Sequence, residues 1–420
     1  MAKLFGIKHD YANAKTEYNI LGIKIKLVNK KILNKPDYTF ALNKIKEKYA
    51  QNKKIRVGFF VSENSKWNAE ILYKELENNN YFEPVVVISA YTTLHQNKDL
   101  TKTSVQANYD FFKEQGKRVI KAYDEEQHKY IPLKELDIDI LFYQQPWGID
   151  DTQHIDVASK DMICCSYTYG LTILKGDFEV RPFHEKLFYY FVANEQTKAI
   201  LKEKEIKCLD NLNIVGYPKL DIYNGLKKIP SEKKTIIYAP HHSYRRGYRV
   251  GTFDFTGEQI LNFAKAHPEY NWVFKPHPDL KEVLYKDKKY GAEFTKKYYE
   301  EWDKIGTRYE KGNYFDLFMA SDLLITDCIS FLLEYIPSGN PLIRLERFHY
   351  ENMSNLGKDI LKGLYRVKSF KAFEKTFNQL LTENNDYLKE TRKSITKNVV
   401  GESYCASKNI VNELEKLFIK

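Results

Sequence analysis

The sequence contains little that would carry the chain across a membrane or out of the cell. No run of apolar residues approaches the length of about 18 that a transmembrane helix requires. The first residues, Met1 to His9, lack the apolar core and the small-residue cleavage site of a secretory signal. These two absences predict a cytoplasmic protein.

Cysteine is also scarce, with five among 420 residues. The number is odd, and no Cys-x-x-Cys pair or zinc-like array of Cys and His occurs, which argues against a disulfide framework. Cys164 and Cys165 are adjacent in an apolar run, so we expect reduced, buried thiols.

No Asp-x-Asp motif follows a predicted strand, since Asp137-Ile138-Asp139 lies at the start of one. We therefore expect no metal ion or other cofactor to be required.

The net charge of +10 is not concentrated in an arginine-rich block, and no nucleic-acid-binding motif accompanies it. We expect no nucleic-acid partner.

One segment, residues 18–31, does combine apolar residues with several lysines, and Lys35 follows it. Such a segment can rest on an anionic membrane surface. The alternative, equally favoured, is a short amphipathic strand packed on the protein. Residues 1–48 are accordingly predicted to be a basic N-terminal extension.

Apolar and aromatic residues are plentiful, at 43% and 15%, and the length exceeds that of one ordinary domain. Continuous Val, Ile and Phe runs alternate with amphipathic, helix-like stretches, which is typical of parallel sheets covered on both faces. The pattern restarts after a polar connector at residues 227–234. The predicted strands are residues 55–61, 82–88, 118–120, 138–143, 162–165 and 187–192, then 235–238, 271–274, 323–325 and 341–344.

This pattern predicts an α/β fold with two Rossmann-like domains that face each other across a cleft. The expected boundaries are 49–228 for the first domain and 229–368 for the second. Residues 369–420 alternate apolar and charged positions and are predicted to be a C-terminal helical segment. In such sheets ligands bind at the carboxyl ends of the strands, so the residues that follow each strand carry the functional argument.

The strand at 323–325 is followed by Thr326, Asp327 and Ser330, and then by a helix-like segment. A strand, a polar turn and a helix start place free backbone N–H groups and a positive helix end around an anion. Glu334 lies one turn further on, where it could reach ribose hydroxyls. The alternative is that Ser330 only caps the helix.

Two other strands of the second domain end in cationic groups. His241, His242 and Arg245 follow the strand at 235–238, and Arg supplies bidentate donors for a pyrophosphate. Lys275 and His277 follow the strand at 271–274, in a loop stiffened by two prolines. The alternatives are a solvated basic loop and a proline-rich surface turn. The clusters together predict a ligand that carries phosphate.

In the first domain two polar, aromatic clusters also follow strands. Gln144, Gln145 and Trp147 form one cluster, and Tyr169 with Gly170 belongs to the other. Amide, indole and phenol groups suit a hydroxylated acceptor, although a packed aromatic loop is an equal alternative.

These residues together resemble the CDP-glycerol glycerophosphotransferase family, which makes teichoic-acid-like polymers and related capsule components. The resemblance covers roughly residues 213–344. The segment Leu-Gly-Ile-Lys-Ile-Lys at 21–26 is also similar to one on bacterial surface-polysaccharide transferases. The matching segments are Gly216-Tyr217-Pro218-Lys219-Leu220-Asp221, Tyr238-Ala239-Pro240, Lys275-Pro276-His277-Pro278 and Ser321-Asp322-Leu323-Leu324-Ile325-Thr326-Asp327 with Ser330.

The resemblance implies a GT-B architecture whose second domain holds the donor nucleotide. It implies that His277 and the turn at 326–330 contact the donor pyrophosphate. An acceptor hydroxyl would attack the phosphorus next to glycerol and expel CMP. The family has a His-Gly pair in the first domain, whose His resembles the general base, but this chain has Tyr169-Gly170. A phenol with an ordinary pKa of about 10 is a poor base at neutral pH.

Another group, such as His154, His184 or Glu63, would then act as the base, or the donor or acceptor differs. The catalytic candidates are His277, Tyr169 and His154. We predict a transferase that moves a phospho-polyol from a CDP-linked donor to a hydroxyl of a bacterial surface-glycan precursor, in capsule, teichoic-acid-like or lipopolysaccharide synthesis. The acceptor would be a glycan or lipid-linked glycan at the inner face of the membrane. The alternatives are a GT-B glycosyltransferase with a nucleotide-sugar donor, and a catalytically silent homologue.

Overall fold

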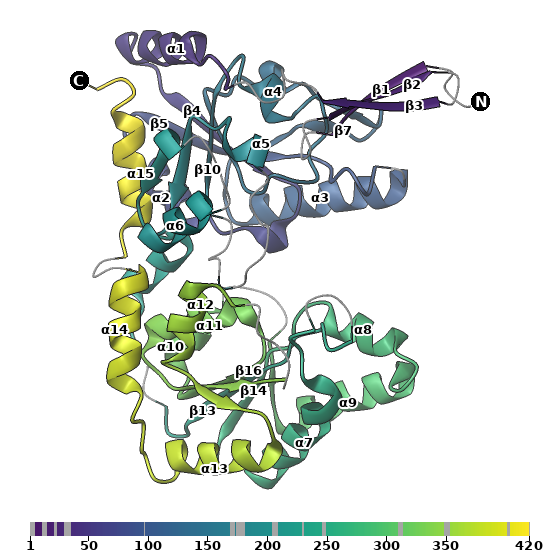
Figure 1. Cartoon of the computed structure of the whole chain (residues 1–420), viewed down its shortest axis with the longest axis vertical. Helices are drawn as coiled ribbons and strands as arrows, with labels where there is room; N and C mark the ends of the chain where they lie inside the picture. Colours follow the sequence, from purple (N-terminus) through teal and green to yellow (C-terminus); the bar gives the residue numbers. More distant parts are fainter. Residues whose placement is uncertain are drawn as a thin grey trace. The chain divides into compact units, whose positions relative to one another are not determined.

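The computed structural model divides the chain into two compact units (Figure 1). The first unit comprises residues 1–170, 177–221 and 404–420, and the second comprises residues 171–176 and 222–403. No described helix is both long and apolar enough to span a membrane. The residues that the structure describes are 5–10, 15–20, 23–28, 35–95, 97–168, 173, 181–203, 209–228, 231–245, 249–309, 314–347, 353–400 and 404–419.

The first unit is built on a parallel sheet with the strand order β12-β11-β10-β9-β4-β5-β6. The chain runs outward from β4 to β6, returns to β9 beside β4, and then continues in the opposite direction. The topological switch point of this sheet therefore lies between β4 and β9. The strands are β4 (Ile55–Val61), β5 (Phe82–Ile88), β6 (Val119–Lys121), β9 (Ile140–Tyr143), β10 (Ile163–Tyr167), β11 (Tyr189–Val192) and β12 (Leu212–Ile214).

The inner strands β4, β5, β9, β10 and β11 of this sheet are almost wholly buried, as their continuous apolar runs predict, whereas the edge strands β6 and β12 are partly exposed. Cys164 and Cys165 on β10 are buried and free, and burial raises the pKa of both thiols. A short antiparallel hairpin and a separate N-terminal sheet complete the unit. The further elements are β1 (Phe5–Asp10), β2 (Lys15–Ile20), β3 (Ile23–Val28), β7 (Tyr123–Asp124), β8 (Lys129–Tyr130), α1 (Thr39–Ala50), α2 (Glu70–Glu77), α3 (Lys98–Glu114), α4 (Ile155–Ala158), α5 (Arg181–His184), α6 (Glu195–Glu203) and α15 (Ala406–Glu415).

The second unit has a parallel sheet with the strand order β15-β14-β13-β16-β17-β18. Its switch point lies between β13 and β16. The elements are β13 (Thr235–Ala239), β14 (Asn271–Phe274), β15 (Gly306–Arg308), β16 (Leu323–Thr326), β17 (Leu342–Leu345), β18 (Tyr365–Val367), α7 (Phe253–Ala266), α8 (Leu280–Lys286), α9 (Gly291–Ile305), α10 (Phe315–Ala320), α11 (Ile329–Tyr335), α12 (Asn355–Leu361), α13 (Phe370–Leu381) and α14 (Lys389–Val400).

The ends of the chain do not form the two separate segments expected at 1–48 and 369–420. Helix α1 is part of the first unit, because Lys44 and Lys48 pair with the buried carboxylate of Asp139 at 3.0 and 2.8 Å. Helices α13 and α14 belong to the second unit, whereas α15 returns to the first. The Asp221 carboxylate accepts the backbone N–H of Ser407 at 2.5 Å at the start of α15. The units thus divide at 221/222 rather than at the predicted 228/229.

Candidate functional site

The site of the second unit lies at the carboxyl ends of β13 and β14, beside the topological switch point between β13 and β16, where ligands of doubly wound folds bind. Pro240 follows β13 directly, so the chain leaves the sheet there, and His241 and His242 come next. Strand β14 pairs with β13 in parallel, with Phe274 opposite Tyr238, so the loop after β14 starts at the same level. The backbone N–H of His277 in that loop donates to Pro240 O at 3.0 Å.

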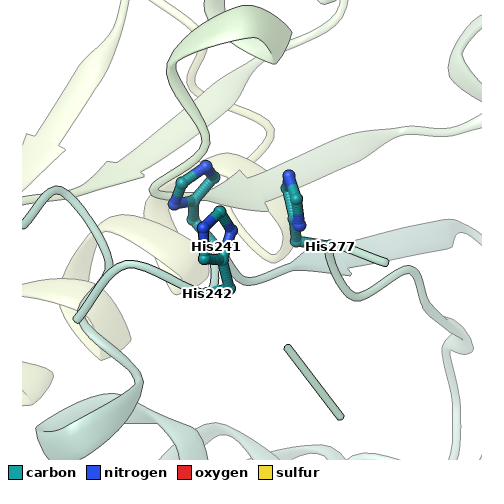
Figure 2. A group of neighbouring side chains, drawn as sticks. All are labelled: His241, His242 and His277. Carbon is teal, nitrogen blue, oxygen red and sulfur yellow. The ribbon is translucent and has the colours of Figure 1, made fainter. Parts of the chain in front are cut away.

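Three imidazole rings meet at this point (Figure 2). The ring centroids of His241 and His242 are 4.3 Å apart, and His277 lies 4.7 Å from the first and 4.2 Å from the second. One potential ligand nitrogen from each ring lies within 4.8 Å of the others. The strand ends therefore bring together residues that are 36 positions apart in the sequence, as the two polar clusters predicted.

The backbone fixes which nitrogen carries the proton in two of these rings. The backbone N–H of Ser243 donates to His241 Nδ1 at 3.2 Å, and the backbone N–H of Asp279 donates to His277 Nδ1 at 3.2 Å. A nitrogen that accepts a hydrogen bond carries no proton, so the neutral rings are both Nε2–H tautomers. His241 and His277 therefore each offer one Nε2–H donor.

The three imidazoles are neutral at physiological pH. Burial, together with the neighbouring imidazoles of His277 and His242, lowers the pKa of His241 to about 3. Burial also lowers the pKa of His277 to about 4, with His242 contributing. The pKa of His242 is lowered by burial as well, although the Asp279 carboxylate opposes the shift. The cluster thus offers N–H donors without offering charge.

A group of three imidazoles can in principle ligate a transition metal. A metal-bound His usually coordinates through Nε2 while its Nδ1–H donates to a carbonyl or carboxylate. In His241 and His277 the arrangement is the reverse, because Nδ1 accepts a backbone N–H. Binding through Nε2 would require a proton at Nδ1, directed against that amide. The Nε2–H groups of His241 and His277 therefore suit an oxyanion.

Lys275 supplies the positive charge at the switch point. Its side chain is buried, and Nζ lies 4.6 Å from the ring centroid of Tyr314 and 5.3 Å from that of Phe331, within cation–π range. Tyr314 Oη donates to Glu334 Oε2 at 2.5 Å. Glu334 is 5% exposed. Its predicted contact with a ribose stays a prediction.

The turn after β16 contains one exposed and two buried polar side chains. Thr326 and Asp327 are buried, whereas Ser330 on the first turn of α11 is exposed. Asp327 Oδ1 accepts the backbone N–H of His241 at 2.6 Å, and Oδ2 accepts the backbone N–H and the hydroxyl of Thr252 at 2.5 and 2.8 Å. Thr326 Oγ1 donates to Ala239 O at 2.6 Å. These two side chains position the His241 loop and leave Ser330 as the accessible group of the turn.

Arg245 pairs with a carboxylate outside the imidazole cluster. Its Nε is 3.1 Å from Asp287 Oδ2, and its side chain is about half exposed. Tyr244 Oη donates to the same carboxylate oxygen at 2.8 Å. The predicted contact of Arg245 with a donor pyrophosphate stays a prediction.

In the first unit the predicted amides lie at the switch point after β9, and both are buried. Gln144 Nε2 donates to Lys66 O at 2.5 Å, and Gln145 Nε2 donates to Trp147 O at 3.1 Å. These amide nitrogens hold the loop together, which leaves the half-buried Trp147 as the more accessible group. Tyr169 and Gly170 lie outside the described residues.

The candidates for the base differ in their surroundings. His154 Nδ1 accepts the backbone N–H of Asp156 at 3.5 Å and lies 2.8 Å from Asp156 Oδ2, and Asp156 also pairs with Lys186. His154 is only 5% exposed, and His184 is similarly buried. Glu63 Oε2 pairs with Lys66 Nζ at 2.9 Å. The role of each stays a prediction.

The contacts that fix these two tautomers cannot be read from the polarity of the sequence. Both rings accept the amide of the residue two positions on, in His241-His242-Ser243 and in His277-Pro278-Asp279. This i→i+2 pattern is the imidazole counterpart of an Asx turn.

A fall in pH should destabilise the native protein more than it destabilises a His277→Asn variant. The unfolded chain takes up a proton on this His near its ordinary pKa of about 6.5, whereas the folded chain does so only near pH 4. Stability is therefore lost as the pH falls from about 6.5 towards about 4, by about 1–2 kcal/mol for this partly exposed group. Urea unfolding at about pH 7.5, 6 and 5 measures the difference. Parallel pH curves for the two proteins would contradict the shift, and His267→Asn is the matched control.

The family model described as CDP-Glycerol:Poly(glycerophosphate) glycerophosphotransferase matches residues 19–416. The teichoic acid glycerol-phosphate primase of Bacillus subtilis (strain 168) is 32% identical to the chain over 167 residues. That match covers 37% of this chain and spans 38% of the length of the primase.

Solved structures are similar over both units of the chain. A variant of the wall teichoic acid polymerase TagF has a TM-score of 0.58 at 13% identity, covering 89% of this chain and 93% of that chain. A putative UDP-N-acetylglucosamine 2-epimerase from Listeria monocytogenes has a TM-score of 0.56 at 14% identity, covering 87% of this chain and 97% of that chain. These similarities confirm the predicted α/β fold of the GT-B type.

Two observations point to the same family: the residues at the strand ends of the second unit, and the match of the family model to residues 19–416. The chain belongs to the CDP-glycerol:poly(glycerophosphate) glycerophosphotransferase family.

Proposed function

We propose that this protein transfers glycerol phosphate from CDP-glycerol to a hydroxyl group of a glycerol-phosphate polymer or related surface-glycan precursor. The acceptor oxygen forms a bond to the phosphorus next to glycerol, and the bond between that phosphorus and the bridging oxygen breaks. CMP leaves with the bridging oxygen, and the hydroxyl proton passes to a base or to water. The family supports this reaction, and the matching TagF structures include one soaked with CDPG.

The observation that carries the proposal is the pair of fixed Nε2–H donors at the switch point of the second unit. Diphosphate oxygens accept hydrogen bonds and donate none, so they complement His241 and His277. As CMP departs, negative charge grows on its phosphate. Oriented N–H groups and the Lys275 ammonium stabilise such charge without reorganising, which is usually the largest catalytic contribution.

The reaction is expected to proceed without a divalent metal, because His241 and His277 present N–H groups rather than lone pairs at Nε2. CMP release from CDP-glycerol, in the presence of a poly(glycerol phosphate) oligomer, should persist within about twofold in excess EDTA. Thermal-shift measurements with CDP-glycerol, CDP-ribitol, UDP-sugars and GDP-sugars form the companion test. Stabilisation by UDP-sugars with release of a nucleoside diphosphate would replace the proposal with a glycosyltransferase. Binding without turnover would indicate a silent homologue.

We propose further that the protein works on the cytoplasmic face of the membrane, with the sheet β1–β3 resting on anionic lipid. Ile23, Ile25 and Leu27 occupy alternate positions of β3 and are 67%, 43% and 54% exposed, so they share one uncovered face.

Charge favours an anionic surface as the partner of this sheet. Residues 1–35 contain eight Lys against Asp10 and Glu17, so 8 − 2 = +6 of the net charge of +10 falls in this short stretch. Lys24, on the opposite face of β3 from Ile23 and Ile25, is 66% exposed. Basic residues near anionic headgroups contribute about 1 kcal/mol each, while the apolar face enters the interface.

Sedimentation with vesicles tests the membrane proposal. The native protein should bind phosphatidylglycerol vesicles, and salt should weaken this binding. Replacing Ile23, Ile25 and Leu27 together by Ser should reduce it about a hundredfold, since each side chain contributes about 1 kcal/mol on partial burial. Leu100→Ser, at another exposed leucine, is the control. Equal binding to phosphatidylcholine, or an unaffected triple variant, would refute the proposal.

A further inference from the structure

A second polar cluster lies at the carboxyl ends of strands in the first unit, and the proposed reaction has not drawn on it. His95 is in the loop that follows β5, and Tyr123 and His128 are in the hairpin that follows β6. Carboxyl ends of parallel strands are where this fold binds ligands. The loop after β9 joins this region, because the backbone N–H of Thr92 donates to Gly148 O at 3.3 Å.

The members of this cluster form a closed chain of hydrogen bonds. His95 Nδ1 lies 3.1 Å from Tyr123 Oη, and Tyr123 Oη lies 2.6 Å from His128 Nδ1. His128 Nε2 lies 2.8 Å from the carbonyl oxygen of His95. The two imidazole rings are stacked, with centroids 4.4 Å apart and planes inclined by 5°.

The closed chain determines every proton position when both imidazoles are neutral. A carbonyl oxygen only accepts, so His128 Nε2 carries the proton and its Nδ1 is bare. Tyr123 therefore donates its single hydroxyl proton to His128 Nδ1. The Tyr123 oxygen must then accept from His95 Nδ1–H, and this leaves His95 Nε2 with a free lone pair. Among the described residues no hydrogen bond to His95 Nε2 is found.

Tyr130 packs against the His95 ring. The ring of Tyr130 lies 5.0 Å from that of His95, and its hydroxyl is buried with no hydrogen-bond partner among the described residues. A buried hydroxyl without a partner costs about 1–3 kcal/mol unless water or a ligand completes it. The Asp150 carboxylate acts on both side chains. Burial nevertheless lowers the pKa of His95 and raises that of Tyr130, so both are neutral.

The surroundings of the cluster are rigid. Gln153 is fully buried and accepts from Ser89 Oγ after β5 at 2.6 Å. Its amide nitrogen donates to Ala122 O after β6 at 2.7 Å and to Ile131 O after β8 at 2.8 Å. One side chain thus ties together the loops that follow three strands, including the loop that carries His95.

We propose that His95 Nε2 and Tyr130 Oη form a site that binds hydroxyl groups of the acceptor polymer. This inference rests on the proposed function and adds to it the acceptor-binding residues of the first unit. A bare imidazole nitrogen accepts hydrogen bonds, and a phenol can donate or accept. Hydroxyl groups donate and accept, so a polyol satisfies both. Phosphate oxygens only accept and cannot donate to His95 Nε2.

The histidines of the second unit have the opposite tautomer. There Nδ1 accepts a backbone amide and Nε2 donates, which suits phosphate. Here Nδ1 donates and Nε2 accepts, which suits hydroxyl groups. A histidine can thus suit phosphate at one site and hydroxyl groups at the other, because the partner of Nδ1 decides whether Nε2 donates or accepts.

Two measurements on the full chain test this site. In ¹⁵N-histidine-labelled protein, the signal absent from a His95→Gln variant should report the Nδ1–H tautomer at neutral pH; an Nε2–H signal would overturn the site. In kinetics with CDP-glycerol and a poly(glycerol phosphate) oligomer, Tyr130→Phe and His95→Gln should each raise the acceptor KM about tenfold. The donor KM should not change.

Tyr130→Phe removes an unpaired buried hydroxyl, so a purely structural role predicts equal or greater stability and unchanged kinetics. Tyr285→Phe, at an exposed tyrosine of α8, is the matched control and should behave as the native protein. An unchanged acceptor KM in both variants, with normal CMP release, would overturn the acceptor site alone. Absence of CMP release from the native protein would overturn the proposed function and this site with it.

Discussion

Replacing His277 by Asn is expected to reduce CMP release from CDP-glycerol by about a hundredfold or more while the fold persists. The Asn Oδ1 atom can accept the Asp279 amide as His277 Nδ1 does at 3.2 Å, so the loop keeps its turn. The shorter side chain has no N–H at the position of Nε2. Removal of one such donor at a site of developing charge costs about 10²–10³ in rate. Isothermal titration with CDP-glycerol should show weaker binding as well.

A second variant, His277→Gln, tests whether the hydrogen-bond donor at Nε2 matters rather than the size of the side chain. The Gln amide nitrogen reaches the position of Nε2, so this variant should retain a larger share of the activity than His277→Asn. His267→Asn, on the same unit outside the cluster, should release CMP at the native rate. A His277→Asn variant with native turnover would remove this residue from the site.

Replacing Asp327 by Asn is expected to destabilise the second unit by about 2–3 kcal/mol and to weaken donor binding. The carboxylate is 1% exposed and accepts three hydrogen bonds from His241 and Thr252. An amide has one oxygen, so its NH₂ group would face an N–H donor that loses its partner. Burial raises the pKa of Asp327 to about 6, so the group is ionised at about pH 7.5, where urea unfolding and donor titration should be measured.

Asp322→Asn is the matched control for this prediction. Asp322 Oδ2 accepts the backbone N–H of Thr235 at 2.8 Å, five residues earlier than Asp327 and at the other end of β16. Its side chain is 24% exposed, so solvent can replace a lost partner. We expect a smaller loss of stability and an unchanged affinity for CDP-glycerol. Equal effects of the two variants on affinity would show that Asp327 does not position the His241 loop.

The strands and the position of the site could be read from the sequence for a simple reason. Strands buried on both faces must be continuously apolar, so the runs at 235–238 and 271–274 were visible, and the polar groups after them marked the ligand edge. The short strands β15 and β18 were missed because three residues carry no pattern. Polarity also could not separate Ser330, which is exposed, from Thr326 and Asp327, which are buried and hold neighbouring loops.

The sequence by itself determined the two α/β arrays, the family and the prediction of a phosphate site after β13, β14 and β16, because hydrophobic periodicity and residue order are local properties. Only the tertiary structure decided which polar groups meet and which nitrogen of each imidazole carries its proton. His241, His277 and His95 are identical in chemistry. Backbone amides make the first two donors at Nε2, and the Tyr123–His128 chain makes the third an acceptor there. A hydrogen-bond partner at one ring nitrogen fixes the chemistry of the other, and folding supplies that partner.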